Sequence, residues 1–136
     1  MKAYLKIIPY MGIVLGLLGL LLLLSLTFPK YCQLANNDFS TIGLQTKRAM
    51  ESHSFEMARY HTFKALSRLE KTKSKLLECN CPAALSSAKD TEVSLKAAAK
   101  SKSIDISKKH LKTALINTAT TIATLEEYAS LKETKQ

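Results

Sequence analysis

The sequence is short of the residues that build turn-rich and strand-rich folds. Its 136 residues include no tryptophan, only 4 glycines and 3 prolines, and aromatic residues make up 7% of the chain. β-Sandwiches and barrels need many tight turns, so this scarcity argues against both. One apolar run near the start leaves residues 30–136 for everything else, which excludes a large multi-domain enzyme. Alanine, lysine, leucine, serine and threonine dominate this remainder, a composition typical of helices.

The uncharged run MGIVLGLLGLLLLLSLTF occupies residues 11–28 and follows the basic residues Lys2 and Lys6. A secretory signal has an apolar stretch of about 7–15 residues, whereas a membrane-spanning helix needs about 17–25. Its length, and the lack of an Ala-x-Ala cleavage motif after it, favour an uncleaved anchor. We therefore expect residues 1–29 to be a signal-anchor transmembrane helix that meets the membrane through residues 7–28. A cleaved signal peptide is the alternative.

The charge of the chain is strongly positive. It has 20 basic and 11 acidic residues, a net charge of +9. The two lysines of the leader account for 2 of these charges, so the remainder carries 18 − 11 = +7. Such a surface favours anionic lipid, an anionic envelope polymer or another protein as partner. We expect no nucleic-acid binding, because the dense segment KAAAKSK at 96–102 is typical of an exposed helix end.

The remainder of the chain is an internal duplication. Residues 32–79 align without a gap on residues 81–128, at an offset of 49 residues, and 12 of the 48 aligned pairs are identical. The most informative identical pairs are Cys32/Cys81, Ser52/Ser101, Ser54/Ser103 and His61/His110. Cysteine, histidine and paired serines do not match by composition alone, so we interpret the alignment as a true repeat.

Each copy of the repeat predicts a helical hairpin. Apolar or small residues recur at spacings of three and four in both halves, and Ser54 and Ser103 are suited to cap the second helix of each copy. Because 49 residues are seven heptads, both copies keep the same face inward. The expected fold is all-α: an antiparallel four-helix bundle of two tandem helical hairpins, 32–79 and 81–128, preceded by one N-terminal hydrophobic helix and followed by a tail at 129–136.

Three cysteines lie at the ends of the expected hairpins. Cys32 opens the first hairpin and Cys79 closes it, and an antiparallel arrangement brings their Cα atoms to the roughly 4.4–6.8 Å that a disulfide needs. We expect the pair Cys32–Cys79, with Cys32–Cys81 or Cys79–Cys81 as alternatives. The closing position of the second hairpin is Tyr128. Cys81 is therefore expected to be the unpaired thiol, and a cross-link through it would make a homodimer.

A second hypothesis is metal or redox chemistry at Cys79 and Cys81. It would also use the thioether and imidazole groups that suit copper, which recur at spacings of 3, 4 and 4 in Met50, His53, Met57 and His61. The polar break at 52–54 interrupts this stripe. Neither a Cys-x-x-Cys motif nor a four-ligand zinc spacing is present in the sequence. We therefore expect no metal and no cofactor.

Sequence motifs of catalysis are missing as well. The chain has no Gly-rich phosphate loop, paired carboxylates or Ser/His/Asp arrangement, so we expect a protein that is not an enzyme. The favoured function is an exported, membrane-anchored helical protein that acts as a structural or interaction module at the cell envelope. An extracytoplasmic metal- or redox-binding protein is the alternative. We expect an extracytoplasmic, single-pass location, or a secreted or periplasmic one if the signal is cleaved.

Overall fold

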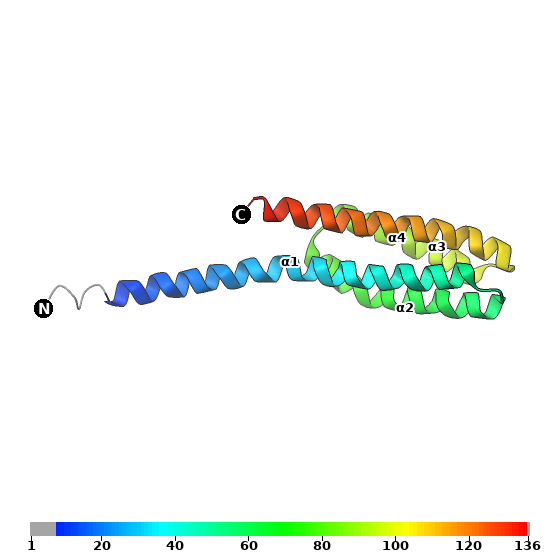
Figure 1. Cartoon of the computed structure of the whole chain (residues 1–136), viewed down its shortest axis with the longest axis horizontal. Helices are drawn as coiled ribbons and strands as arrows, with labels where there is room; N and C mark the ends of the chain where they lie inside the picture. Colours follow the sequence, from blue (N-terminus) through cyan, green and yellow to red (C-terminus); the bar gives the residue numbers. More distant parts are fainter. Residues whose placement is uncertain (1–7, 136) are drawn as a thin grey trace, which may run out of the picture.

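The computed structural model describes the backbone of residues 8–135 and the side chains of residues 12–19 and 30–135. The described residues form four helices, joined by short turns (Figure 1). Their bounds are α1 Ile8–Glu51, α2 Phe55–Cys79, α3 Pro82–Lys100 and α4 Ile104–Glu133. The predicted all-α fold is confirmed.

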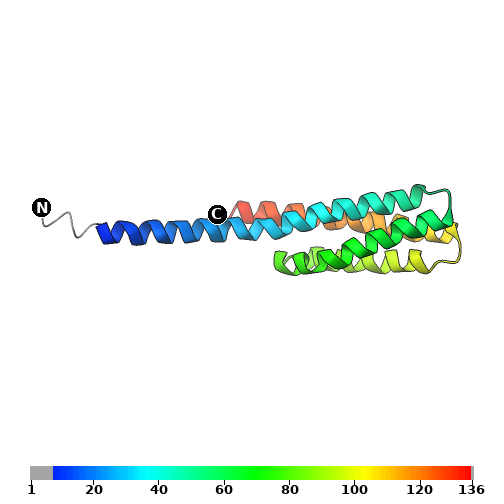
Figure 2. The same cartoon turned by 90° about the horizontal axis from the view of Figure 1, so that it is seen from below.

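The helices run alternately up and down and form a bundle (Figures 1 and 2). α1 packs along α2, and α3 packs along α4, which makes the two hairpins; α1 also packs on α4 and α2 on α3. Only the later part of α1 lies in the bundle, while its earlier part projects well beyond the other helices (Figure 1). The turn between α2 and α3 lies at the end of the bundle from which α1 projects (Figure 2).

Two expected boundaries differ from the structure. The N-terminal apolar segment is not a separate helix, because α1 runs continuously from Ile8 to Glu51. The tail expected at 129–136 is helical as far as Glu133. Both boundaries came from hydropathy and from the end of the repeat, and neither a change of hydropathy nor the end of a repeat interrupts backbone hydrogen bonding. The segment ASLK after Tyr128 contains no helix-breaking residue.

Within the described part of the chain, no helix is both long enough and apolar enough to cross a bilayer. Of the apolar run at 11–28, the side chains of residue 11 and of residues 20–28 lie outside the described part. The expected membrane anchor therefore stays a prediction.

The duplication is visible in the core, where buried residues repeat with the offset of 49. The pairs Ala35/Ala84, Ala49/Ala98, Ala65/Ala114 and Leu76/Leu125 are all buried. At other buried pairs, one hairpin has a large side chain where the other has a smaller one. These pairs are Phe39/Ala88, Leu69/Thr118, Thr46/Leu95 and Thr62/Leu111. Equivalent helices are diagonal across the bundle. A large side chain of one hairpin is therefore matched at the same level by a smaller one of the other, which fills the core.

Threonine is unusually common in this core, and its hydroxyl groups are satisfied within their own helices. Each buried threonine donates to the carbonyl oxygen four residues earlier, at 2.7–3.0 Å, in Thr46, Thr62, Thr72, Thr91, Thr118 and Thr121. A buried hydroxyl without a partner would destabilise the fold. These local bonds allow short side chains to line the core, so the helices can approach closely.

The turns confirm the predicted helix starts. The Ser54 hydroxyl accepts a hydrogen bond from the Met57 backbone N–H at 3.2 Å, and the Ser103 hydroxyl accepts one from the Ile106 N–H at 3.4 Å. Asn80 ends α2 in the left-handed conformation, with φ of 57°, which asparagine tolerates better than most residues. It lets the chain reverse between the two hairpins within two residues.

The matched caps give a first prediction. Ser54→Ala and Ser103→Ala each remove the acceptor of one helix-terminal N–H group, and each should lower the free energy of unfolding by about 1 kcal/mol. Urea unfolding of the full chain in maltoside micelles, followed by circular dichroism, measures both. Ser74→Ala is the control, because this exposed serine lies inside α2 and alanine is the better helix former there. Equal effects in all three variants would contradict the cap assignment.

Candidate functional site

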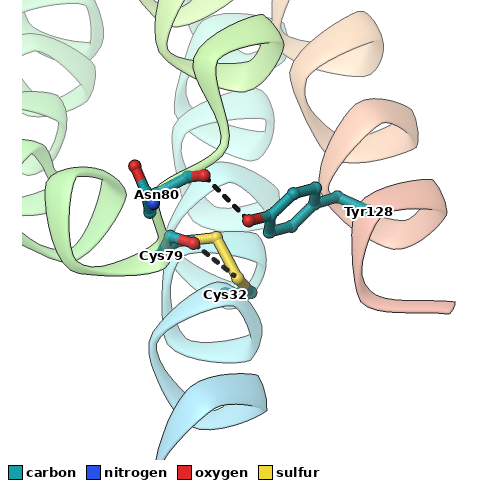
Figure 3. Close-up of a disulfide and its surroundings, with 4 residues drawn as sticks. All are labelled: Cys32, Cys79, Asn80 and Tyr128. Atoms are coloured by element: carbon teal, nitrogen blue, oxygen red, sulfur yellow. Dashed lines mark hydrogen bonds between the residues drawn. A yellow bond between two sulfur atoms is a disulfide. The ribbon is translucent and has the colours of Figure 1, made fainter. Parts of the chain in front are cut away.

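The disulfide predicted from the hairpin geometry is confirmed. Cys32 of α1 and Cys79 at the end of α2 are bonded at 2.04 Å, with Cα atoms 4.8 Å apart and 47 residues of sequence separation. Both half-cystines are buried, and Cys32 Sγ lies 3.7 Å from the Cys79 carbonyl oxygen. The bond closes the open end of hairpin one, which we define as residues 32–79, beside the projecting part of α1 (Figure 3).

Hairpin two, residues 81–128, is closed by a different interaction. The Tyr128 hydroxyl, at the position equivalent to Cys79, donates to the Asn80 carbonyl oxygen at 2.9 Å (Figure 3). Its partner by symmetry, Cys81, is a free thiol and is 4% exposed. Tyr128 thus ties the end of α4 to the residue just before Cys81. The burial of Cys81 disfavours the homodimer expected from a cross-link through this thiol, because a second chain has little access to its sulfur.

The residues of the metal and redox hypothesis are distributed over two helices, α1 and α2, and the two turns that follow them. Cys79 is consumed by its bond to Cys32 and is not a free thiol. The His and Met stripe is broken as the sequence indicated, because α1 ends at Glu51 and α2 begins at Phe55. No group of three or more His, Cys, Asp or Glu residues positioned for a metal ion occurs among the described residues.

His61 has a structural partner instead. Its Nδ1 lies 2.8 Å from Gln45 Oε1 of α1, so this nitrogen carries the proton when the ring is neutral. Burial lowers the pKa of His61, and the positive charges of Arg48 and Lys64 lower it further. The ring also stands edge-on to Tyr60, with centroids 5.3 Å apart. The contact with Gln45 links α2 to α1 through His61.

A buried carboxylate joins the same two helices nearer the disulfide. Asp38 of α1 is 8% exposed. Its Oδ2 accepts from the Thr72 hydroxyl at 3.1 Å and from Lys75 Nζ at 2.5 Å, and its Oδ1 lies 3.7 Å from Arg68. The equivalent contact in hairpin two is neutral, between the Ser87 and Thr121 hydroxyls at 2.8 Å. The negative charge of Asp38 is therefore balanced by neighbouring cations.

A groove between α1 and α2 lies next to this carboxylate. It has a volume of about 250 Å³, and we name it the basic groove. Its walls are Thr41 and Gln45 of α1 with Lys64, Ser67, Arg68 and Lys71 of α2. The lining carries three positive charges and no carboxylate, so the groove favours an anion.

A second groove, between α2 and α3, has a more apolar lining and a volume of about 290 Å³. Its walls include Leu69, Leu76, Leu77, Leu85 and Ala88. Lys73 also lines this groove, and it bonds Glu70 at 2.8 Å and Glu92 at 3.0 Å, while Glu92 also bonds Lys96 at 2.5 Å. The hydrogen bond to Glu70 raises the pKa of Lys73, and the hydrogen bond to Glu92 raises it further. The hydrogen bonds from Lys96 and Lys73 lower the pKa of Glu92. This ion-pair network pins α2 to α3.

Sequence reasoning placed the disulfide but missed Asp38 and the basic groove. Lysines and an arginine at 64, 68 and 71 have spacings of four and three, which put them on one helix face. That spacing was the available signal. It did not show that the face borders a groove, because this depends on which polar residues α1 places opposite.

Comparison of the chain with protein-family models, with curated proteins and with solved structures finds no match in any of the three.

The disulfide gives a second prediction. Cys32→Ser should lower the free energy of unfolding by about 4 kcal/mol, the value expected for releasing a loop of this length in the unfolded state. Helix content in the folded state should be retained. Denaturant unfolding of the full chain in maltoside micelles, without reductant, measures the loss. Cys81→Ala is the matched control, because it removes a buried sulfur that makes no disulfide. Equal effects of the two substitutions would contradict the assignment.

His61 gives a third prediction. Its pKa in the folded state is lower than in the unfolded state, so below about pH 6.5 the unfolded chain binds more protons. Stability should therefore decrease as the pH falls from 7.5 to 5.5. His61→Gln keeps a polar side chain without titration and should reduce this decrease. Urea unfolding at both pH values tests it, and an identical pH dependence in the two proteins would refute the role of His61.

Proposed function

We propose that this chain is an extracytoplasmic helical module, anchored by a single membrane span, that acts as a structural or interaction protein at the cell envelope. The observation that carries the proposal is the Cys32–Cys79 disulfide. Disulfides persist in oxidising compartments and are rare in the cytosol. The apolar run at 11–28 supplies a route to such a compartment.

The length and continuity of α1 support an uncleaved membrane anchor over a cleaved signal peptide. At a rise of 1.5 Å per residue, the 18 residues of the apolar run extend over about 27 Å, close to the roughly 30 Å of a bilayer core. The same helix continues to Glu51 inside the bundle. A continuous helix would hold the bundle at a fixed orientation to the membrane, as a spacer or docking module requires. A secreted or periplasmic bundle after signal cleavage is the alternative form of the proposal.

The partner chemistry follows from charge. The chain outside residues 1–29 has 18 basic and 11 acidic residues, a net charge of +7. Its basic groove has no carboxylate in its lining. An anionic lipid, an anionic envelope polymer or an acidic protein would be attracted to this face. A binding role, rather than catalysis, suits a site that offers cations and hydroxyls without a nucleophile activated by a neighbouring base.

A topology experiment tests the location and gives a fourth prediction. Lys102→Cys places an exposed thiol in the turn between α3 and α4, and Ala3→Cys places one before the apolar run. In intact cells, a membrane-impermeant maleimide should label the chain with Lys102→Cys but label the chain with Ala3→Cys only after lysis. The buried Cys81 of the unmodified chain gives the background signal.

The same preparation distinguishes an anchor from a cleaved signal. We expect the intact mass of the full-length chain and retention in the membrane after alkaline carbonate extraction. Loss of the leader mass together with release from the membrane would support the secreted form. Labelling of Lys102→Cys only after lysis would contradict both forms, because the bundle would then lie inside the cell.

A further inference from the structure

The basic groove contains cations that are only partly neutralised within the protein. Lys71 and Ser67 make no hydrogen bond or ion pair in the part of the chain whose side chains are described. The Lys64 ammonium lies over the ring of Tyr60, with Nζ 4.8 Å from the centroid. Arg68 lies 3.7 Å from Asp38, but Lys75 is closer to the same carboxylate at 2.5 Å. The positive charge that faces the groove therefore exceeds the negative charge around it.

His61 lies at the border of the groove and is subject to the charge of the same Lys64. Its partner Gln45 is one of the groove walls. After burial, the charges of Arg48 and Lys64 are the causes that lower its pKa. The groove and its border therefore disfavour an additional positive charge and would stabilise a negative one.

The duplication supplies an internal control for whether the fold needs these cations. In hairpin two, the positions equivalent to Lys64, Arg68 and Lys71 are Thr113, Asn117 and Thr120. The position equivalent to Thr41 is Asp90, and the one equivalent to Arg48 is Ala97. Hairpin two forms the same pair of packed helices with none of these positive charges. The cations of hairpin one are thus not a requirement of the hairpin.

From this we infer that the groove between α1 and α2 is a binding site for a phosphate group, held by Lys64, Arg68 and Lys71. Proteins bind phosphate oxygens mainly through the guanidinium group of arginine and the ammonium group of lysine. The hydroxyl of Ser67 adds a neutral donor on the α2 side of the groove, whereas the Thr41 hydroxyl on the α1 side donates to the Asn37 carbonyl oxygen at 3.3 Å. The groove, with a volume of about 250 Å³, has room for a phosphate group.

The phosphate has two chemical sources, a soluble phosphate ester or a lipid headgroup. Thr41 lies 13 residues after Phe28, the end of the apolar run, which is about 20 Å along a helix. If α1 is anchored as proposed, the groove stands beyond the headgroups of its own membrane, so a soluble phosphate is favoured. The binding site itself does not depend on the anchor, and failure of one proposal leaves the other intact.

Titration with phosphate tests the site directly and gives a fifth prediction. The full chain is kept in maltoside micelles, and inorganic phosphate or glycerol 3-phosphate is added at constant ionic strength, set with sodium chloride. Calorimetry gives the affinity, and NMR shifts of the Thr41, Gln45 and Ser67 amides locate the ligand. We expect saturable binding and a rise of the His61 pKa when the groove is filled. Binding that is absent, or that moves amides elsewhere, would overturn the inference.

Variants that copy hairpin two distinguish binding at the groove from nonspecific attraction by the net positive charge of the chain. Lys64→Thr with Arg68→Asn and Lys71→Thr should weaken phosphate binding at least tenfold. The double variant Lys64→Thr with Lys71→Thr keeps the Arg68–Asp38 contact, in case the triple variant unfolds, and should also weaken binding. The matched control removes three exposed lysines near and on α4, by Lys102→Thr, Lys109→Thr and Lys112→Thr. Equal weakening by the control would refute the site, because it would show that only total charge matters.

A short-chain lipid distinguishes the two sources. Dihexanoyl phosphatidylglycerol presents a lipid phosphodiester headgroup, whereas glycerol 3-phosphate presents a soluble ester. Tighter binding of glycerol 3-phosphate supports a soluble source, and tighter binding of the lipid supports a headgroup. Either result upholds a phosphate site, and binding of neither ligand overturns it.

Discussion

The offset of 49 residues between the two copies of the repeat is the constraint on which the rest of this structure depends, and it equals seven complete heptads. Because the two copies share one pattern of apolar and small residues, most buried positions of one hairpin have a buried equivalent in the other. The same offset puts Ser54 and Ser103 at matching helix starts. It also brings the hairpin ends to one end of the bundle, where Cys32 meets Cys79 and Tyr128 meets Asn80.

The two hairpins separate what the fold requires from what has been added to it. Small residues, threonines bonded within their helix and serine caps occur in both copies, so they belong to the packing. The Thr72–Asp38 bond of hairpin one has a neutral counterpart in Ser87–Thr121 of hairpin two. Both copies therefore have a polar contact between their two helices at this position, but only hairpin one has a charged residue in it. Features found in one copy alone are the natural candidates for function.

The fold was predictable from sequence to the extent that its determinants are local or periodic. Helix faces follow from spacing, helix starts from Ser54 and Ser103, and the disulfide from the antiparallel return of one hairpin. The continuity of α1 was missed because hydropathy marks solvent preference and not backbone breaks. The basic groove was missed because it needs the register of α1 against α2, which decides that Thr41 and Gln45 face Lys64 and Arg68.

The disulfide lies in the hairpin that also carries the three cations of the basic groove. Like charges at spacings of three and four, as in Lys64, Arg68 and Lys71, destabilise a helix by about 0.2–0.5 kcal/mol per pair. The core of hairpin one combines alanines and threonines with a few large apolar side chains, Phe39, Ile42, Leu69 and Leu76. Hairpin two has neutral residues at the positions equivalent to the three cations and closes with one tyrosine hydrogen bond. In hairpin one, the disulfide contributes about 4 kcal/mol in the chain-entropy model, several times the repulsion among these three cations, so the bond more than offsets the cost of placing them on one helix face.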